Sequence, residues 1–185
     1  MSDLWFTPRL TIPSKTDLNW INYHYGGYNY CTAITDGWQY STGSTLPNCT
    51  GYAWGRWREI LGYRHNLYTG DGGTWYGHTS DGYQRSTTTP KLGCVACWGG
   101  SGVDGHVAIV EEMTLDSRGI VQSCLVGESA WQSTNTFRTR TIRRSNNWWI
   151  YNNVGTFQGF IYLPVDFLPG PVIFNGGKKM KVRIG

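Results

Sequence analysis

The chain has 185 residues, enough for one domain with a real hydrophobic core and a short appendage. It holds 25 glycines and 15% aromatic residues but only 15% charged residues, a composition that argues against a helical bundle and favours short strands joined by glycine turns. The formal net charge of +4 is modest and suits an anionic polymer, but no basic cluster resembles a nucleic-acid motif, so we expect no nucleic-acid partner.

The N-terminal residues 1–20 contain Pro8 and Pro13 and few periodic apolar positions, and they predict an extended arm. They lack the apolar core and the small-residue cleavage site of a secretory signal, and no apolar run approaches the length of a membrane span. We therefore expect cytoplasmic synthesis and no membrane partner. In that compartment the five cysteines are expected to be reduced: Cys31, Cys49, Cys94, Cys97 and Cys124.

Residues 21–46 predict an irregular aromatic segment that leads into a helix. Its tyrosines and tryptophan either line a substrate groove or pack on the flank of the domain, and the sequence leaves both possibilities open. The aromatic residues are Tyr23, Tyr25, Tyr28, Tyr30, Trp38 and Tyr40.

A helix is predicted over residues 49–61. Asn48 is a favourable cap for its first turn, apolar residues recur with helical spacing, and Gly62 ends it. Cys49 then stands in the first turn, where the helix dipole and free N–H groups favour a thiolate. Cys49 is therefore a candidate nucleophile, and the alternative is a small buried apolar residue.

Short strands are predicted after the helix, and the turn at residues 115–119 has the composition of a hairpin. Consecutive short strands favour an antiparallel sheet, and a helix followed by a sheet gives an α+β fold. Residues 166–185 change in composition and predict a linker or the start of a further module. The strands are expected at residues 94–98, 106–113, 120–127, 136–143 and 159–162.

Five segments in a fixed order resemble the CHAP family, the cysteine- and histidine-dependent amidohydrolases/peptidases of bacterial and phage cell-wall lysis. The resemblance implies a papain-like fold of the NlpC/P60–CHAP type, with the cysteine helix packed on an antiparallel sheet. It also implies a catalytic domain over residues 21–165 and a short helix near residues 79–85. The segments are Asn48 to Trp57, Pro90 to Trp98, Gly105 to Glu111, Val126 to Trp131 and Phe157 to Pro164.

The resemblance makes Cys49 the nucleophile, His106 the base and Glu128 the group that orients the imidazole by accepting its Nδ1–H. Glu111 and Glu112 are rivals by proximity. Strand alternation places Glu111 on the face opposite His106, while Glu112 shares that face but lies roughly 20 Å along the strand. We therefore expect the carboxylate to come from the neighbouring strand.

Several other polar residues are weaker candidates for a functional role. The remaining histidines are expected at the surface: His24, His65 and His78. Many family members have an asparagine two residues after the glutamate, where this chain has Ala130, so Ser129 or another residue would fill any fourth polar role. Asn48 or a tyrosine of the aromatic segment is a possible oxyanion donor. The alternation of Arg138 and Arg140 indicates a solvated strand face.

No metal or other cofactor is indicated. Cys94 and Cys97 have no partner ligands at zinc spacing, and in an extended strand they point to opposite faces. Some relatives bind calcium through an Asp-rich loop before the cysteine, and here that region holds only Asp36.

Together these features predict a monomeric peptidoglycan hydrolase of the phage endolysin or tail-lysin type, acting on the wall after holin-type release or as part of a virion. It would cleave an amide bond in the peptide part of the wall, as an amidase or an endopeptidase. NlpC/P60 peptidases use a third histidine, and none follows His106. A non-catalytic wall- or glycan-binding module, using ten tryptophans and twelve tyrosines, is the alternative from a different class.

Overall fold

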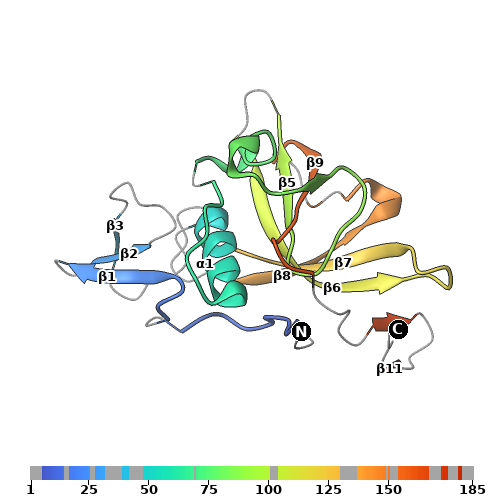
Figure 1. Ribbon diagram of the computed structural model, residues 1–185, viewed down its shortest axis with the longest axis horizontal. Helices are drawn as coiled ribbons and strands as arrows, with labels where there is room; N and C mark the ends of the chain where they lie inside the picture. The colour runs from blue at the N-terminus through green and yellow to red at the C-terminus, as the bar shows by residue number, and fades with distance from the viewer. Residues whose placement is uncertain are drawn as a thin grey trace.

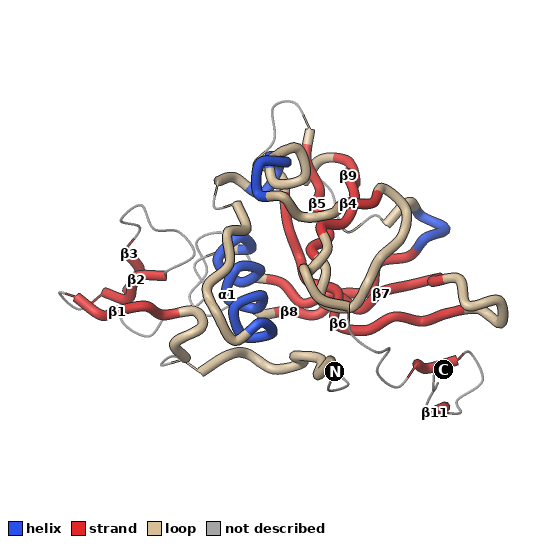
Figure 2. The backbone as a smooth tube through the Cα atoms, in the orientation of Figure 1, coloured by secondary structure: helices blue, strands red, loops and turns tan. Residues whose placement is uncertain are grey.

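A computed structural model of the chain combines one α-helix with a large β-sheet, and so confirms the α+β class (Figures 1 and 2). For residues 21–25, 28–31, 39–41, 172–174 and 179–180 the backbone alone is described. The structure describes residues 6–14, 17–25, 28–31, 39–41, 48–68, 70–100, 104–129, 137–148, 150, 154–166, 172–174 and 179–180.

Helix α1 spans Cys49–Leu61, as the sequence predicts. The Asn48 side chain accepts a hydrogen bond from the Gly51 N–H, which satisfies one of the free donors of the first turn. At the other end Gly62 adopts the left-handed conformation, with φ of 73°, and its N–H bonds the Arg58 carbonyl. Both ends of the helix are therefore encoded locally by the residues beside them.

The main sheet has an antiparallel body in the order β8-β7-β6-β5-β9-β4. β6 and β7 form the predicted hairpin, in which Asp116 accepts backbone N–H groups from Arg118 and Ile120. The strands are β4 (Arg85–Ser86), β5 (Val95–Gly99), β6 (His106–Leu115), β7 (Val121–Glu128), β8 (Arg138–Arg143) and β9 (Thr156–Ile161).

The strand order departs from the simple consecutive arrangement at two places. β9 returns to pair with β5 on the side away from β6, and the unpredicted β4 then pairs with β9. Beyond the body, β10 (Val172–Phe174) lies parallel to the end of β6 and pairs with β11 (Lys179–Met180). Pairing between strands distant in sequence has no local signal, which is why the sequence predicts a strand at residues 159–162 but not its place beside β5.

Two further predictions need correction. The segment before the helix is not irregular, because it contains an antiparallel meander of β1 (Ile21–Tyr25), β2 (Tyr28–Cys31) and β3 (Gln39–Ser41). The prediction that its aromatic side chains line a groove or pack on a flank lies outside what the structure describes, because only the backbone of these strands is described. The predicted short helix near residues 79–85 is a single 3-10 turn, Thr79–Asp81, followed by strand β4.

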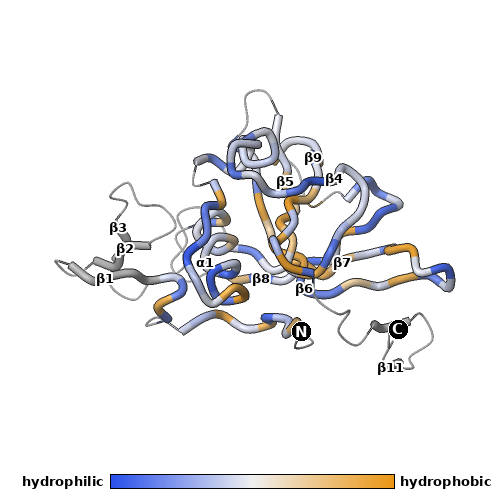
Figure 3. The backbone as a smooth tube through the Cα atoms, viewed as in Figure 1, coloured by the Kyte–Doolittle hydropathy of each residue, from blue (hydrophilic) through white to orange (hydrophobic). Residues whose placement is uncertain are grey.

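The sheet carries an apolar core on each face. On one side the helix packs through Tyr52, Ala53 and Trp57 against β-strand residues that include Cys97. Cys94 belongs to the core of the other face, so the two cysteines point to opposite sides as predicted. Figure 3 shows the hydrophobic stretches gathered in the sheet strands next to the helix. The sheet thus holds the start of the helix rigidly against the start of β6.

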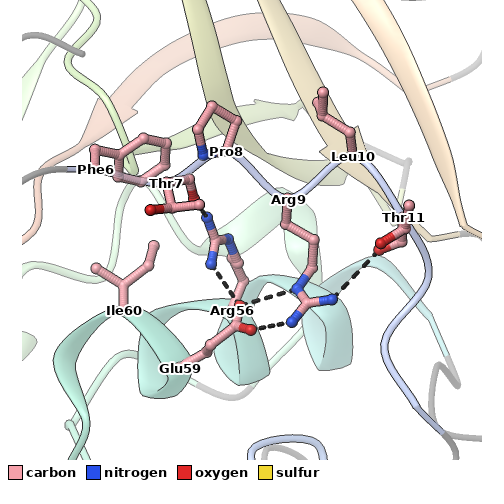
Figure 4. A pocket seen from close by; sticks show the side chains of 9 residues that line it. All are labelled: Phe6, Thr7, Pro8, Arg9, Leu10, Thr11, Arg56, Glu59 and Ile60. Carbon is pink, nitrogen blue, oxygen red and sulfur yellow. Dashed lines mark hydrogen bonds and ion pairs between the residues drawn. The ribbon is translucent and has the colours of Figure 1, made fainter.

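The N-terminal segment runs along the helix near its C-terminal half (Figure 4). The Arg9 guanidinium binds the Glu59 carboxylate, and the Thr7 carbonyl accepts a hydrogen bond of 2.6 Å from Arg56. Phe6 is buried there and lies under the Arg56 guanidinium. The residues between segment and helix line a pocket of about 390 Å³, whose helix residues lie seven to eleven positions after Cys49, roughly 10–16 Å along the helix.

Candidate active site

Cys49 is the first residue of α1 and is partly exposed. Backbone N–H groups of Thr50, in the helix, and of Val107, in strand β6, act against burial to lower the pKa of its thiol. The Asn48 carboxamide oxygen also accepts the Thr50 hydroxyl at 2.8 Å, which fixes the turn that presents the cysteine. N–H groups at a helix N-terminus stabilise a negative charge on the sulfur.

His106 opens strand β6 and is buried on one side by Trp98, whose ring centroid lies 5.9 Å from that of the imidazole. The residue before it, Gly105, has φ of 74°, and a β-carbon there would come within 2.2 Å of the Gly73 backbone. Only glycine fits this approach without displacing the neighbouring loop. The glycine preceding the histidine therefore lets the loop at Gly73 close over the strand start.

Glu128 ends strand β7 and is fully buried. Gly127 pairs with Ile109 of β6, which brings the next residue beside the start of that strand. The Glu128 Oε2 atom lies 2.7 Å from His106 Nε2. The expectation that this carboxylate accepts the Nδ1–H was wrong, because Nε2 makes the contact.

The three side chains are therefore brought together in the order Cys49, His106, Glu128, with the imidazole hydrogen-bonded to both neighbours. Burial opposes the charged imidazole, but attraction to the Cys49 thiolate and hydrogen bonds to the thiolate and to Glu128 raise the pKa of His106 to about 9. The arrangement favours a histidine that is already protonated at neutral pH.

The sulfur and the carboxylate respond in the opposite direction. Burial raises the pKa of the Cys49 thiol, but the His106 charge and hydrogen bonds from His106, Val107 and Thr50 outweigh it, so the pKa is lowered. The pKa of Glu128 is also lowered, because its bonds to His106 and Arg140 outweigh burial. Both shifts favour a thiolate–imidazolium pair backed by a carboxylate.

The two rival glutamates lie elsewhere. Glu111 is buried on the helix side, where it binds the Arg56 guanidinium and the Tyr52 hydroxyl. A β-bulge between Val110 and Glu112 shifts the alternation, and Glu112 then pairs with Leu125. Glu112 therefore does not share the face of His106, contrary to the expectation from regular alternation.

The structure also shows the contacts of other polar residues for which the sequence makes a prediction. His65 is not a surface residue: it is buried, its Nε2 bonds the Trp54 carbonyl and its Nδ1 accepts the Leu67 N–H. Burial lowers its pKa to about 4, so this ring is neutral. Asn48 uses its side-chain oxygen for capping. The hydroxyl of Ser129 is buried and has no hydrogen-bond partner among the described residues.

Sequence reasoning missed Arg140, which was expected on a solvated strand face. Its Nε donates a hydrogen bond of 2.6 Å to Glu128 Oε1. The available signal was the succession of β7 and β8, since an antiparallel neighbour of the strand ending in Glu128 places its own residues beside that carboxylate.

Over the described ranges, no three His, Cys, Asp or Glu side chains gather as a possible metal site, and no helix is long and apolar enough to cross a bilayer.

This geometry can be set beside known proteins. The sequence model of the CHAP domain matches residues 38–130, a segment that contains all three site residues. The chain belongs to the CHAP family. The resemblance to this family is thereby confirmed, and the structure shows the α+β fold in which the cysteine helix packs on an antiparallel sheet.

One solved structure similar to this CHAP chain is an N-acetylmuramoyl-L-alanine amidase from Staphylococcus aureus. The similarity has 25% identity and a TM-score of 0.46, and it covers 62% of this chain and 30% of the amidase. The chain therefore spans less than a third of that protein. No curated protein matches the chain significantly.

Proposed function

We propose that this CHAP chain is a peptidoglycan hydrolase that cleaves an amide bond in the peptide part of the bacterial wall. Membership in the CHAP family supports the substrate class and the hydrolytic reaction. The single observation that carries the mechanism is the contact chain from the Cys49 sulfur through the His106 ring to Glu128. Cys49 is the nucleophile, His106 the acid and base, and Glu128 the orienting carboxylate.

In the first half of the reaction the Cys49 thiolate attacks the amide carbonyl carbon and forms a C–S bond. The carbonyl electron pair moves onto oxygen, where the Cys49 backbone N–H at the start of α1 stabilises the oxyanion. The His106 imidazolium gives its proton to the amide nitrogen, the C–N bond breaks, and the amine leaves. The product is a thioester on Cys49 with a neutral His106.

In the second half a water molecule replaces the amine. Neutral His106 takes a proton from the water as its oxygen attacks the thioester carbonyl. The C–S bond then breaks, the acid product leaves, and the thiolate–imidazolium pair is restored. Glu128 holds the ring at Nε2 through both halves, so the other nitrogen stays aimed at the reacting groups.

The amide bond that is cut distinguishes an amidase from an endopeptidase. An amidase cuts between N-acetylmuramic acid and L-alanine and releases new L-alanine amino groups, whereas an endopeptidase exposes another residue of the stem or cross-bridge. We propose a monomer acting directly on the insoluble wall. The modest positive charge of +4 favours approach to an anionic wall.

Digestion of purified Gram-positive walls followed by identification of the new end groups tests this proposal. We expect the turbidity to fall and new amino groups to appear without new reducing sugar ends. New reducing ends would identify a glycosidase and contradict the proposal. Binding to walls with no lysis and no new ends would instead favour the aromatic binding module.

A further inference from the structure

Glu128 has a second partner besides His106. One carboxylate oxygen, Oε2, binds the imidazole, and the other, Oε1, accepts the hydrogen bond from Arg140 Nε at 2.6 Å. Arg138 Nε lies 3.8 Å from Oε1, an ion-pair distance without a hydrogen bond. The two oxygens of the carboxylate are thus held from two directions, one by the reacting group and one by Arg140.

The second contact matters because Glu128 is fully buried. A buried carboxylate bound through one oxygen can still rotate, and burial alone favours its neutral form. A neutral carboxyl would no longer stabilise the imidazolium of His106. Charged hydrogen bonds to both oxygens keep the group ionised and fix its plane.

Arg140 also differs from His106 in the permanence of its charge. The imidazole is charged at rest and neutral after it has protonated the leaving amine, so its support for the carboxylate changes during each turnover. A guanidinium stays protonated throughout. Arg140 therefore keeps Glu128 ionised in the half of the cycle in which His106 is neutral.

The contact between Arg140 and Glu128 follows from the pairing register of β7 and β8. Arg138 of β8 stands directly opposite Glu128, and Arg140 opposite Val126. Arg140 is therefore the diagonal neighbour on the same face, within reach of a long side chain. Its side chain is 35% exposed, so it closes the outer edge of the site. Ala130, two residues after the glutamate, has no polar side-chain atom to do this.

We propose that Arg140 is the positioning residue of this active site: it holds and keeps ionised the carboxylate that orients His106. It acts through Glu128 and does not touch the reacting atoms. The kinetic part of this inference rests on the proposed wall hydrolysis. The ionisation of the site itself is also accessible without any substrate.

The test compares Arg140→Gln and Arg140→Lys with Arg143→Gln, which removes the same charge from an exposed residue of the same strand. Arg140→Gln should lower kcat about 10-fold, the low end of the cost of losing an outer-shell partner in metal sites, with KM little changed. The acid limb of its kcat/KM–pH profile should move up by about 1 pH unit, because a carboxylate that has lost its adjacent cation stabilises the imidazolium, and through it the Cys49 thiolate, less well. Arg140→Lys should recover part of both effects, and Arg143→Gln should resemble the parent.

The second readout is the rate at which iodoacetamide alkylates Cys49 as a function of pH, scored on the Cys49 peptide by mass spectrometry. We expect the acidic inflection to move upward in Arg140→Gln and to move back in Arg140→Lys. If this shift appears while walls are not cut, the positioning role stands and the proposed function falls. Unchanged pH profiles in both readouts, or equal effects of Arg143→Gln, would overturn the positioning role.

Discussion

At the scale of single residues, the proposed mechanism depends on opposite shifts in the pKa values of two groups. His106 has its pKa raised to about 9, mainly by the Cys49 thiolate acting against burial, and the thiol has its pKa lowered by the imidazolium. The charged pair is therefore favoured at a pH above the lowered pKa of the thiol and below the raised pKa of His106. Acid removes it by protonating the sulfur, and alkali removes it by deprotonating the ring.

This predicts a bell-shaped dependence of kcat/KM on pH, with an alkaline limb near pH 9. The activity should be retained at pH 8, because the ring is still protonated there, and should fall as the pH passes through the pKa of His106. Initial rates on soluble wall fragments from pH 5 to 10 measure this. An alkaline limb near the ordinary histidine value of 6.5 would show that the pair is not formed at rest.

Glu128→Gln tests the orienting carboxylate. The amide keeps the shape but loses the charge that stabilises the imidazolium. Loss of the corresponding partner costs up to ~10⁴-fold in kcat in a serine protease, and a preformed ion pair should reduce the cost to about 10- to 1000-fold. The melting temperature should change little. Glu112→Gln is the matched control, and an equal loss in both variants would remove the special role of Glu128.

At the scale of elements, the helix is joined to the sheet by a buried charge pair as well as by apolar packing. Both Glu111 oxygens bind the Arg56 guanidinium, at 3.0 Å each. Glu111 also accepts the Tyr52 hydroxyl and the Arg9 N–H, so the N-terminal segment, the helix and β6 meet at one carboxylate. Breaking such a pair leaves an unpaired buried charge.

Arg56→Met should therefore lower the free energy of unfolding by about 3 kcal/mol or more, as expected for removal of one partner of a buried ion pair. The double variant Arg56→Met/Glu111→Leu should recover much of this loss. The control Lys91→Met breaks an exposed pair with Asp166 and should cost at most about 1 kcal/mol. Urea denaturation measures all three, and a double variant no more stable than Arg56→Met alone would contradict the pairing.

The local signals explain which elements were predictable. Asn48 caps the start of the helix and Gly62 ends it in the left-handed conformation, so both ends can be predicted from local sequence. Asp116 and Gly119 do the same for the β6–β7 turn. The bulge before Glu112 and the 3-10 turn at Thr79–Asp81 depend on tertiary packing. They are therefore invisible to periodicity, and the face of Glu112 was predicted wrongly for that reason.

At the scale of the whole molecule, the predicted class and the meeting of the three site residues follow from the helix–sheet order together with the family resemblance. The insertion of β9 beside β5 and the parallel β10 require contacts across the chain. The same is true of Arg140, whose role emerges only from the register of β7 with β8. Residue types thus indicate the chemistry, while the register selects which charged neighbour supports it.

The central claim is that the Cys49 thiolate is the nucleophile of a wall hydrolase. Serine at this position lacks an easily formed anion. Clearing of purified walls by the parent chain and by Cys49→Ser, at equal concentration of folded protein, tests it most directly. Cys124→Ala, a change to a buried cysteine outside the site, is the control.

We predict that the parent and Cys124→Ala clear the walls, while Cys49→Ser keeps its fold by circular dichroism and shows no measurable clearing, since loss of a hydrolase nucleophile costs on the order of 10⁶-fold in kcat. Clearing by Cys49→Ser at near the parent rate would contradict the account.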